Sequence, residues 1–423
     1  MDLQTGENRQ VELSDEVMET AQRIYGDERV QAALAFIEQD AEQTLRDQIT
    51  LTEIPAPSFQ ESTRGEYFRE LLQTFGLADI QTDAEGNVFG TWRGSGSGSR
   101  PTVFICAHLD TVFPAGTDTK VREKEGVYYA PGISDDGRGL ATVLGVLRAL
   151  QESGISTVGD VIFGATVGEE GLGDLRGVKA FFRDHDDVDG FISIEPGDPT
   201  RTTYLATGSR RYKVTFAGPG GHSFGAFGTP SAIHALGRAV SLIADVQVPS
   251  EPKTTFTVGE IRGGTSVNTI AAEASLMLDM RSNSMDELAN LEAEILSRIQ
   301  EAVDAENVRW GSNAISVEMK LVGDRPAGAQ ASDARIVQAA MAATRSMGMS
   351  PELDGAMSTD SNVPISLGIP AVTLGGGGIP AGMHTLQESF DPVDAHLGVQ
   401  RTFLALLGLV GVSGLTEPLL SHD

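Results

Sequence analysis

Continuous apolar runs alternate with helical patterns through much of the chain. The runs are short and rich in β-branched residues, which predicts buried strands at TVFICAHLD, DVIFGATVGEEG and GFISIEPGD. Between them, apolar residues at helical spacing predict helices at DGRGLATVLGVLRALQESG and GVKAFFRDH. Further helices are expected over residues 15–50 and after the proline-marked loop at IPAP. Strands that alternate with helices predict an α/β layer with a largely parallel sheet.

The pattern changes near residue 208. A strand of alternating polarity is followed there by a helix, two strands joined by a turn, a long helix and a closing strand that ends near residue 323. This order predicts a small α+β domain with one antiparallel sheet. Because the α/β pattern returns afterwards, we expect residues 209–323 to be inserted into a discontinuous domain formed by residues 1–208 and 324–423.

Composition narrows the class of protein. The net charge of −28 argues against a nucleic-acid partner and against binding to anionic membranes. Lysine supplies six of the 31 basic residues, a composition that suits either a high-salt cytoplasm or a GC-rich genome. No apolar run approaches the ~20 residues of a membrane span, and the polar start lacks the features of a signal peptide. We interpret the single cysteine, Cys106, as a buried hydrophobe, and its isolation favours a cytoplasmic location.

Histidines and carboxylates gather after the predicted strands, where open α/β sheets place their active sites. A divalent metal such as zinc, manganese or cobalt suits this combination of ligands. Each short motif is common by chance, but their occurrence at successive strand ends predicts a metal site. The candidate residues are His108, Asp110, Asp135, Asp136, Glu169, Glu170, Glu195 and His384.

Two further patterns concern individual side chains. In the His108-x-Asp110 motif, alternate residues of an extended chain lie on one side, so Asp110 can support the imidazole. His222 lies among glycines in GPGGHSFG, where the backbone can approach a ligand closely, and we expect a functional role for it.

Taken in order, these motifs resemble those of one enzyme family. They are HLDTV, PGISDDGRG, GEEGLGD, SIEPGD, GGHS, TSVNTI, DMRS, STDSNVP and MHTLQE. The chain is similar to the co-catalytic zinc metallopeptidases that include peptidase T, glutamate carboxypeptidase, aminoacylase and the acetylornithine and succinyl-diaminopimelate deacylases. The STDSNVP region is most similar to the peptidase T-like branch. The resemblance implies a zinc-peptidase-like three-layer α/β catalytic domain, residues 1–208 and 324–423, and an α+β lid and dimerisation domain, residues 209–323.

The same resemblance implies roles for single residues. Two divalent ions would be held by two ligand sets that share a bridging aspartate. Zinc is the preferred metal, with manganese or cobalt as alternatives. Glu169 would act as general base, Asp110 would orient His108, and His222 would stabilise an oxyanion in the partner subunit's site. Asn268 and Arg281 would bind the substrate. The ligand sets are His108, Asp135 and Glu195 for one ion, and Asp135, Glu170 and His384 for the other.

Some positions stay open. The DDGRG sequence leaves a one-residue ambiguity between Asp135 and Asp136 as the bridging ligand, and we prefer Asp135 because it comes first after GIS. Relatives have a cis peptide bond between these two aspartates, which predicts one here. Asp360 fits either a substrate-side or a structural role.

The resulting functional expectation is a metal-dependent exopeptidase that acts on di- and tripeptides as a cytoplasmic homodimer. The alternative within the hydrolases is a deacylase or amidohydrolase of N-acyl amino acids or another small amide. A catalytically inert binding protein would have lost a ligand or the base, yet all candidate positions carry competent residue types.

Overall fold

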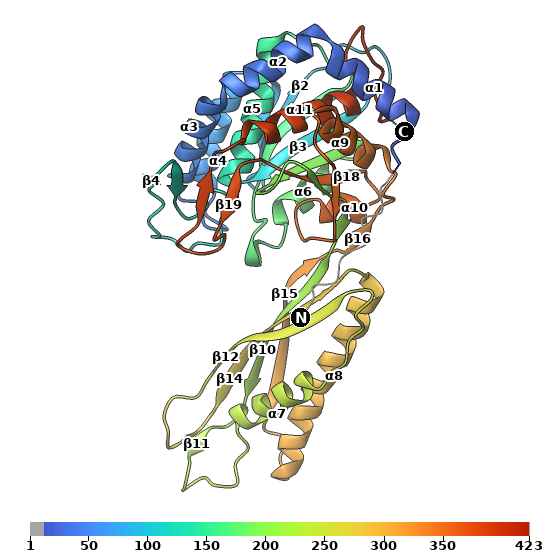
Figure 1. Cartoon of the computed structure of the whole chain (residues 1–423). Helices are drawn as coiled ribbons and strands as arrows, with labels where there is room; N and C mark the ends of the chain where they lie inside the picture. Colours follow the sequence, from blue (N-terminus) through green and yellow to red (C-terminus); the bar gives the residue numbers. More distant parts are fainter. Residues whose placement is uncertain (1–11, 423) are drawn as a thin grey trace. The chain divides into compact units, whose positions relative to one another are not determined.

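The computed structural model describes residues 12–422 and divides the chain into two compact units (Figure 1). The first, which we call the α/β unit, comprises Met1–Leu205 and Ala329–Asp423, and the second, the inserted unit, is Ala206–Gly328. Within the described residues, no helix has the length and apolar character needed to cross a membrane.

An eight-stranded mixed sheet forms the centre of the α/β unit. Its strands are β1 (Ala78–Thr82), β2 (Val88–Trp92), β3 (Thr102–His108), β6 (Asp160–Thr166), β7 (Gly190–Glu195), β8 (Arg201–Thr203), β17 (Glu352–Asp354) and β18 (Ala371–Gly375). They lie in the order β1-β2-β6-β3-β7-β18-β8-β17. The strands β6, β3, β7 and β18 pair in parallel, as do β8 and β17, whereas β1, β2 and β8 pair antiparallel with their other neighbours. This confirms the predicted mixed, largely parallel sheet.

Helices cover both faces of this sheet. They are α1 (Asp15–Gly26), α2 (Glu28–Gln39), α3 (Ala41–Thr52), α4 (Ser62–Gln73), α5 (Gly137–Ser153), α6 (Arg176–Asp184), α9 (Arg335–Ser346), α10 (Asn362–Ser366) and α11 (His396–Val410), with a short 3-10 helix η1 (Gly171–Gly173). A second small sheet, in the order β19-β20-β5-β4, is antiparallel. Its strands are β4 (Arg122–Lys124), β5 (Val127–Tyr129), β19 (Ile379–Ala381) and β20 (Ser389–Asp391).

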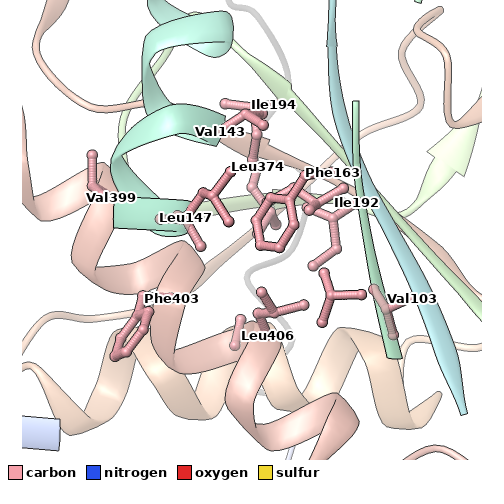
Figure 2. Close-up of a cluster of buried hydrophobic side chains, with 14 of the residues drawn as sticks. Val103, Val143, Leu147, Phe163, Ile192, Ile194, Leu374, Val399, Phe403 and Leu406 are labelled. Carbon is pink, nitrogen blue, oxygen red and sulfur yellow. The ribbon is translucent and has the colours of Figure 1, made fainter. Parts of the chain in front are cut away.

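The alternation of side chains along β3 explains the three layers. Val103 belongs to the hydrophobic cluster of Figure 2, which also contains Leu147 of α5 and Phe403 of α11. The next residue, Phe104, points to the opposite face, and its ring centroid lies 4.1 Å from that of Phe181 on α6. Because both faces are covered by helices, β3 and β6 are buried along nearly their whole length.

The inserted unit contains a four-stranded antiparallel sheet in the order β12-β14-β10-β15. Helices α7 and α8 share one hydrophobic core with it. A two-stranded ladder of β11 and β13 continues beyond the sheet, and the short strands β9 (Leu205–Ala206) and β16 (Gly328–Ala329) pair with each other. The elements are β10 (Gly208–Ala217), β11 (Gly221–His222), α7 (Ala232–Ala244), β12 (Thr254–Gly263), β13 (Thr269–Ile270), β14 (Glu273–Ser282), α8 (Met285–Arg309) and β15 (Ser316–Arg325).

Candidate metal centre

The candidate ligands of the α/β unit lie at the ends of its strands and in the adjoining loops. His108 ends β3, Glu195 ends β7, and the glutamate pair follows β6. Asp135 lies between β5 and α5, and His384 lies between β19 and β20. The parallel strands β6, β3 and β7 are neighbours in the sheet, so their carboxyl ends bring these side chains to one edge.

Asp135 lies between two histidines and presents a different oxygen to each. Its Oδ1 is 3.0 Å from Nε2 of His108, and its Oδ2 is 3.0 Å from Nε2 of His384. Each histidine also faces a glutamate: His108 Nε2 is 3.9 Å from Glu195 Oε2, and His384 Nε2 is 3.0 Å from Glu170 Oε1. The structure therefore brings together two sets of three donors that share Asp135.

The neighbouring Asp136 has other partners. Its side chain is fully buried, Oδ1 accepts the N–H of Gly139 at 2.9 Å, and Oδ2 accepts the N–H of His108 at 3.2 Å. The first contact caps the N-terminus of α5. Asp136 also has an oxygen within 4.8 Å of donor atoms of His108 and Glu195. The peptide bond between Asp135 and Asp136 is cis, as predicted.

The imidazole of His108 is oriented by a backbone group. Its Nδ1 lies 2.9 Å from the carbonyl oxygen of Asp110 but 3.7 Å from the nearer carboxylate oxygen of that residue. The carboxylate instead accepts three hydrogen bonds, from Ser58 Oγ at 2.6 Å, from the N–H of Glu169 at 2.9 Å and from the N–H of Glu170 at 3.1 Å. Asp110 therefore fixes the segment that carries the two glutamates.

The glutamate pair sits in a tight turn. Both side chains are buried, and Glu170 has an extended backbone (φ −81°, ψ 144°), so that neighbouring side chains point in different directions. Gly168, which precedes the pair, has φ of +68°, and a Cβ atom there would lie 2.6 Å from Cγ of Arg176. This position therefore requires glycine.

The electrostatics of the cluster favour positive charge. The carboxylates of Asp135 and Glu170 raise the pKa of His384 to about 10. Burial opposes the charged form of His108, but the surrounding carboxylates, chiefly those of Asp110 and Asp135, outweigh it and hold the pKa of His108 well above the usual value. Burial raises the pKa of Glu195 well above its usual range. A divalent cation would compete with the protons on these groups.

The donor set fits a divalent ion. Among residues 12–422, the buried Oε1 atom of Glu195 has no hydrogen-bond partner, as expected for an atom reserved for a ligand. Imidazole nitrogens and carboxylate oxygens are the donors that zinc, manganese and cobalt accept.

Two polar residues near the cluster had no assigned role in the sequence. Ser58 donates to the Asp110 carboxylate, and Glu388 accepts the N–H of Asp135 at 2.9 Å. Glu388 belongs to the motif MHTLQE, and this is the one feature of the sequence that could have indicated a role for it. Asp360 is buried and accepts a hydrogen bond from Thr166, the residue opposite His108 in the β3–β6 ladder. That contact favours the structural role for Asp360.

The three remaining candidates belong to the inserted unit. His222 pairs with Thr269 between β11 and β13, and the carbonyl oxygen of Asn268 accepts the N–H of Ser223 at 3.0 Å, so His222 and Asn268 are close neighbours. Arg281 lies near the far end of β14, where its Nε donates to Asp279 at 2.8 Å.

Comparison with known proteins identifies the family. The model of the peptidase family M20/M25/M40 matches residues 104–407. The chain belongs to this peptidase family. A probable carboxypeptidase of Aspergillus flavus is 25% identical over 261 residues, which are 55% of this chain and 61% of that relative. Carboxypeptidase G2 of a Pseudomonas species is 26% identical over 233 residues, 51% of this chain and 54% of its own length. The chain thus matches little more than half of the length of these M20 relatives.

Solved structures of similar fold cover more of the chain. The aminopeptidase PepT of Bacillus cereus is 23% identical with a TM-score of 0.68, and the match covers 86% of this chain and 97% of that one. A tripeptidase of Staphylococcus aureus is 22% identical with a TM-score of 0.70 over the same shares of the two chains. At this level of identity, the likeness of these M20-type structures establishes the fold.

Proposed function

We propose that this protein is a metal-dependent hydrolase that cleaves peptide bonds of short peptides, as a di- or tripeptide exopeptidase. The observation that carries the proposal is the position of Asp135, which offers one oxygen to each of two histidine–glutamate pairs. A bridging ligand of a dinuclear centre needs this arrangement. His108, Asp135 and Glu195 would hold one divalent ion, and Asp135, Glu170 and His384 the other, with zinc as the first choice and manganese or cobalt as alternatives.

Two such ions, when bound, supply a water of lowered pKa and polarise the carbonyl of the scissile bond. The chain's own residues would then handle protons and orientation. Glu169 is buried beside the ligand Glu170 on the segment that Asp110 fixes. In this position it would accept the proton of the attacking water and return it to the leaving nitrogen.

His222 is suited to donate a hydrogen bond to a developing oxyanion. Its Nδ1 accepts the N–H groups of Phe224 and Gly225, each at 3.2 Å. A neutral ring that accepts at Nδ1 carries its proton on Nε2, which is then available as a donor.

The separation of His222 and Arg281 along the inserted unit supports an active site to which two copies of the chain contribute residues. The eight-residue step along β14 from Glu273 to Arg281 covers ~26 Å at ~3.3 Å per residue. His222 pairs with Thr269, which precedes Glu273 in the chain, so it lies beyond that end of β14. An extended tripeptide spans ~10 Å. One substrate would therefore meet both side chains only if they came from two subunits, which supports a homodimer formed through the inserted unit as lid.

The names of similar proteins bear on the substrate class. Two proteins of similar structure are named as an aminopeptidase and a tripeptidase, and the curated relatives are named as carboxypeptidases. Asn268 and Arg281 would bind the carboxylate or another polar group of the substrate. Deacylation of an N-acyl amino acid or another small amide is the alternative, because the same centre would attack either carbonyl. Buried Cys106 is compatible with the cytoplasmic location that we predict.

The test is metal analysis of the purified protein together with hydrolysis of dipeptides, tripeptides and N-acyl amino acids. We expect about two bound divalent ions per chain, the number that two three-ligand sets with a shared carboxylate would hold. Hydrolysis should be fastest with a peptide, and removal of metal by a chelator should abolish it. Faster turnover of acyl amino acids would establish the alternative, and an absence of both metal and hydrolysis would refute the proposal.

A further inference from the structure

The side chain of Glu388 is fully buried and surrounded by backbone donors. Its Oε2 accepts the N–H of Gly132 at 2.9 Å, and its Oε1 accepts the N–H groups of Ser134 and Asp135, both at 2.9 Å. Three amides of one short segment thus converge on one carboxylate. The last of these amides belongs to Asp135, which lies between the two histidines.

Further bonds join the same two segments. The N–H of Ala130 donates to the carbonyl oxygen of Glu388 at 3.2 Å, and Ser134 Oγ donates to the carbonyl oxygen of Ser389 at 3.1 Å. Nearby, β20 pairs with β5 through the register Ser389–Tyr129. Residues 130–135 therefore run beside the segment that contains Glu388 and, four residues earlier, His384.

These contacts relate two of the proposed ligands. His384 Nε2 meets Asp135 Oδ2 at 3.0 Å, while Glu388 holds the backbone N–H of the same aspartate. The loop that carries His384 is thus attached to the loop that carries Asp135 at two points, one between side chains and one at the backbone.

We infer that Glu388 is a positioning residue that sets the location of Asp135 relative to His384, and so the geometry in which both ions are bound. This inference rests on the proposed dinuclear function. A carboxylate suits the role because it accepts hydrogen bonds and donates none when ionised. A glutamine of the same size would place an NH₂ group against one of the three amides, which leaves a buried donor without an acceptor.

Glu388→Gln tests the inference against a merely structural role, with Glu306→Gln as the matched control. Glu306 is also fully buried and accepts a backbone N–H, that of Ser231 at 3.1 Å, but it belongs to the inserted unit. Both variants lose a buried carboxylate, so both should unfold more easily than the wild-type chain. The distinguishing measurements are calorimetric titration of the metal-free proteins with Zn²⁺ and the visible spectrum of their Co²⁺ forms.

We expect Glu388→Gln to weaken the binding of at least one ion by about 10- to 100-fold, the usual effect of removing a partner of a ligand. Its Co²⁺ absorption bands should also shift, because the coordination geometry changes. Glu306→Gln should bind Zn²⁺ and Co²⁺ like the wild-type chain. If Glu388→Gln does not fold, Glu388→Asp, which keeps the carboxyl group but shortens the reach, is measured by the same criteria.

The possible failures are distinct. Wild-type affinity and an unchanged Co²⁺ spectrum in the Glu388 variant, with two ions bound, would overturn the positioning role and leave the proposed function intact. Equal losses of affinity in the Glu388 and Glu306 variants would also overturn it, since a general loss of stability would then be the cause. A wild-type chain that binds none of Zn²⁺, Co²⁺ and Mn²⁺ would instead refute the proposed function.

Discussion

The carboxylate of Asp110 accepts the backbone N–H of Glu169 at 2.9 Å. It holds Glu170 in the same way and is itself held by Ser58. The residue that the sequence associates with the His108 ring thus also fixes the turn that carries the proposed base. Any change in this carboxylate should move Glu169 and Glu170 together.

The first prediction concerns Asp110→Asn. The amide keeps the size of the side chain but turns an NH₂ group toward one of three donors, so the glutamate turn should be displaced. We expect kcat to fall by about 100-fold, with weaker binding of one ion, and Ser58→Ala to lower kcat by only about 10-fold because one of the three bonds is lost. Steady-state kinetics and metal titration would check this order. A larger loss in the Ser58 variant would contradict it.

The glutamate pair should respond asymmetrically to substitution. Glu170→Ala removes a proposed ligand and should lower the metal content toward one ion per chain. Glu169→Gln should keep both ions while kcat falls by about 10²- to 10⁴-fold, the usual contribution of a general base. Elemental analysis and kcat, measured on the same preparations, separate the two effects, and Glu66→Gln at an exposed position of α4 serves as the control. Retention of near-normal turnover by Glu169→Gln would show that another group is the base.

The adjacent aspartates offer a third comparison. Asp135→Asn should lower the affinity for both ions, since this side chain faces both histidines. Asp136→Asn should mainly destabilise the fold, by about 1–3 kcal/mol, because its NH₂ group would face the N–H of Gly139 or of His108 in a buried position. Metal titration and thermal unfolding of both variants would show which aspartate bridges. The reverse result would assign the bridge to Asp136.

The sequence predicts those features that depend on local pattern. Apolar runs identified β3, β6 and β7, and ligand-type residues at their ends indicated a common edge, where the structure brings both Glu170 and Glu195 close to His108. Contacts between distant segments have no such pattern. Ser58 lies 52 positions from Asp110, and Glu388 lies 253 positions from Asp135.

Backbone partners are equally hidden from sequence reasoning. The expectation that Asp110 supports His108 was based on strand alternation, which gives the side of a side chain but not its partner. The structure places the Asp110 carbonyl oxygen, not its carboxylate, nearest the ring nitrogen. The order of elements in the inserted unit, in contrast, follows from alternation and helical spacing, and its antiparallel sheet was predicted.

Complementation tests whether His222 acts in the partner subunit. His222→Gln and Glu169→Gln should each be nearly inactive alone. A mixed dimer contains one subunit of each variant. If His222 serves the partner's site, one site of this dimer carries both substitutions and the other site carries neither. A 1:1 mixture that exchanges subunits freely should then regain about a quarter of wild-type activity, because half of the dimers are mixed. If the mixture is shown to exchange subunits and yet regains no activity, His222 acts in the site of its own subunit.

Asp160 provides a prediction for stability that is independent of metal. Its side chain lies 3.0 Å from Arg100 Nε and 3.1 Å from an amino group of Arg93, and it accepts the N–H of Gly94 at 2.7 Å. Burial alone would raise the pKa of Asp160, but Arg100, Gly94 and Arg93 outweigh it and hold that pKa below the usual value. The folded chain therefore releases this proton more readily than the unfolded chain does.

The resulting stabilisation should be complete above the pKa of the unfolded carboxyl group, ~3.9, and should disappear as the pH falls through the lower pKa of the folded state. Asp160→Asn should thus reduce the free energy of unfolding by about 2 kcal/mol at pH 7, since bonds to a charged group are lost. The difference in the free energy of unfolding between the variant and the wild type should become smaller as the pH is lowered below 4. Urea unfolding across this range would check the sign, and Asp184→Asn, which alters an exposed pair with Arg183, should show a much weaker dependence because solvent screens that pair. If this difference in the free energy of unfolding does not change with pH, the charge of Asp160 does not stabilise the fold.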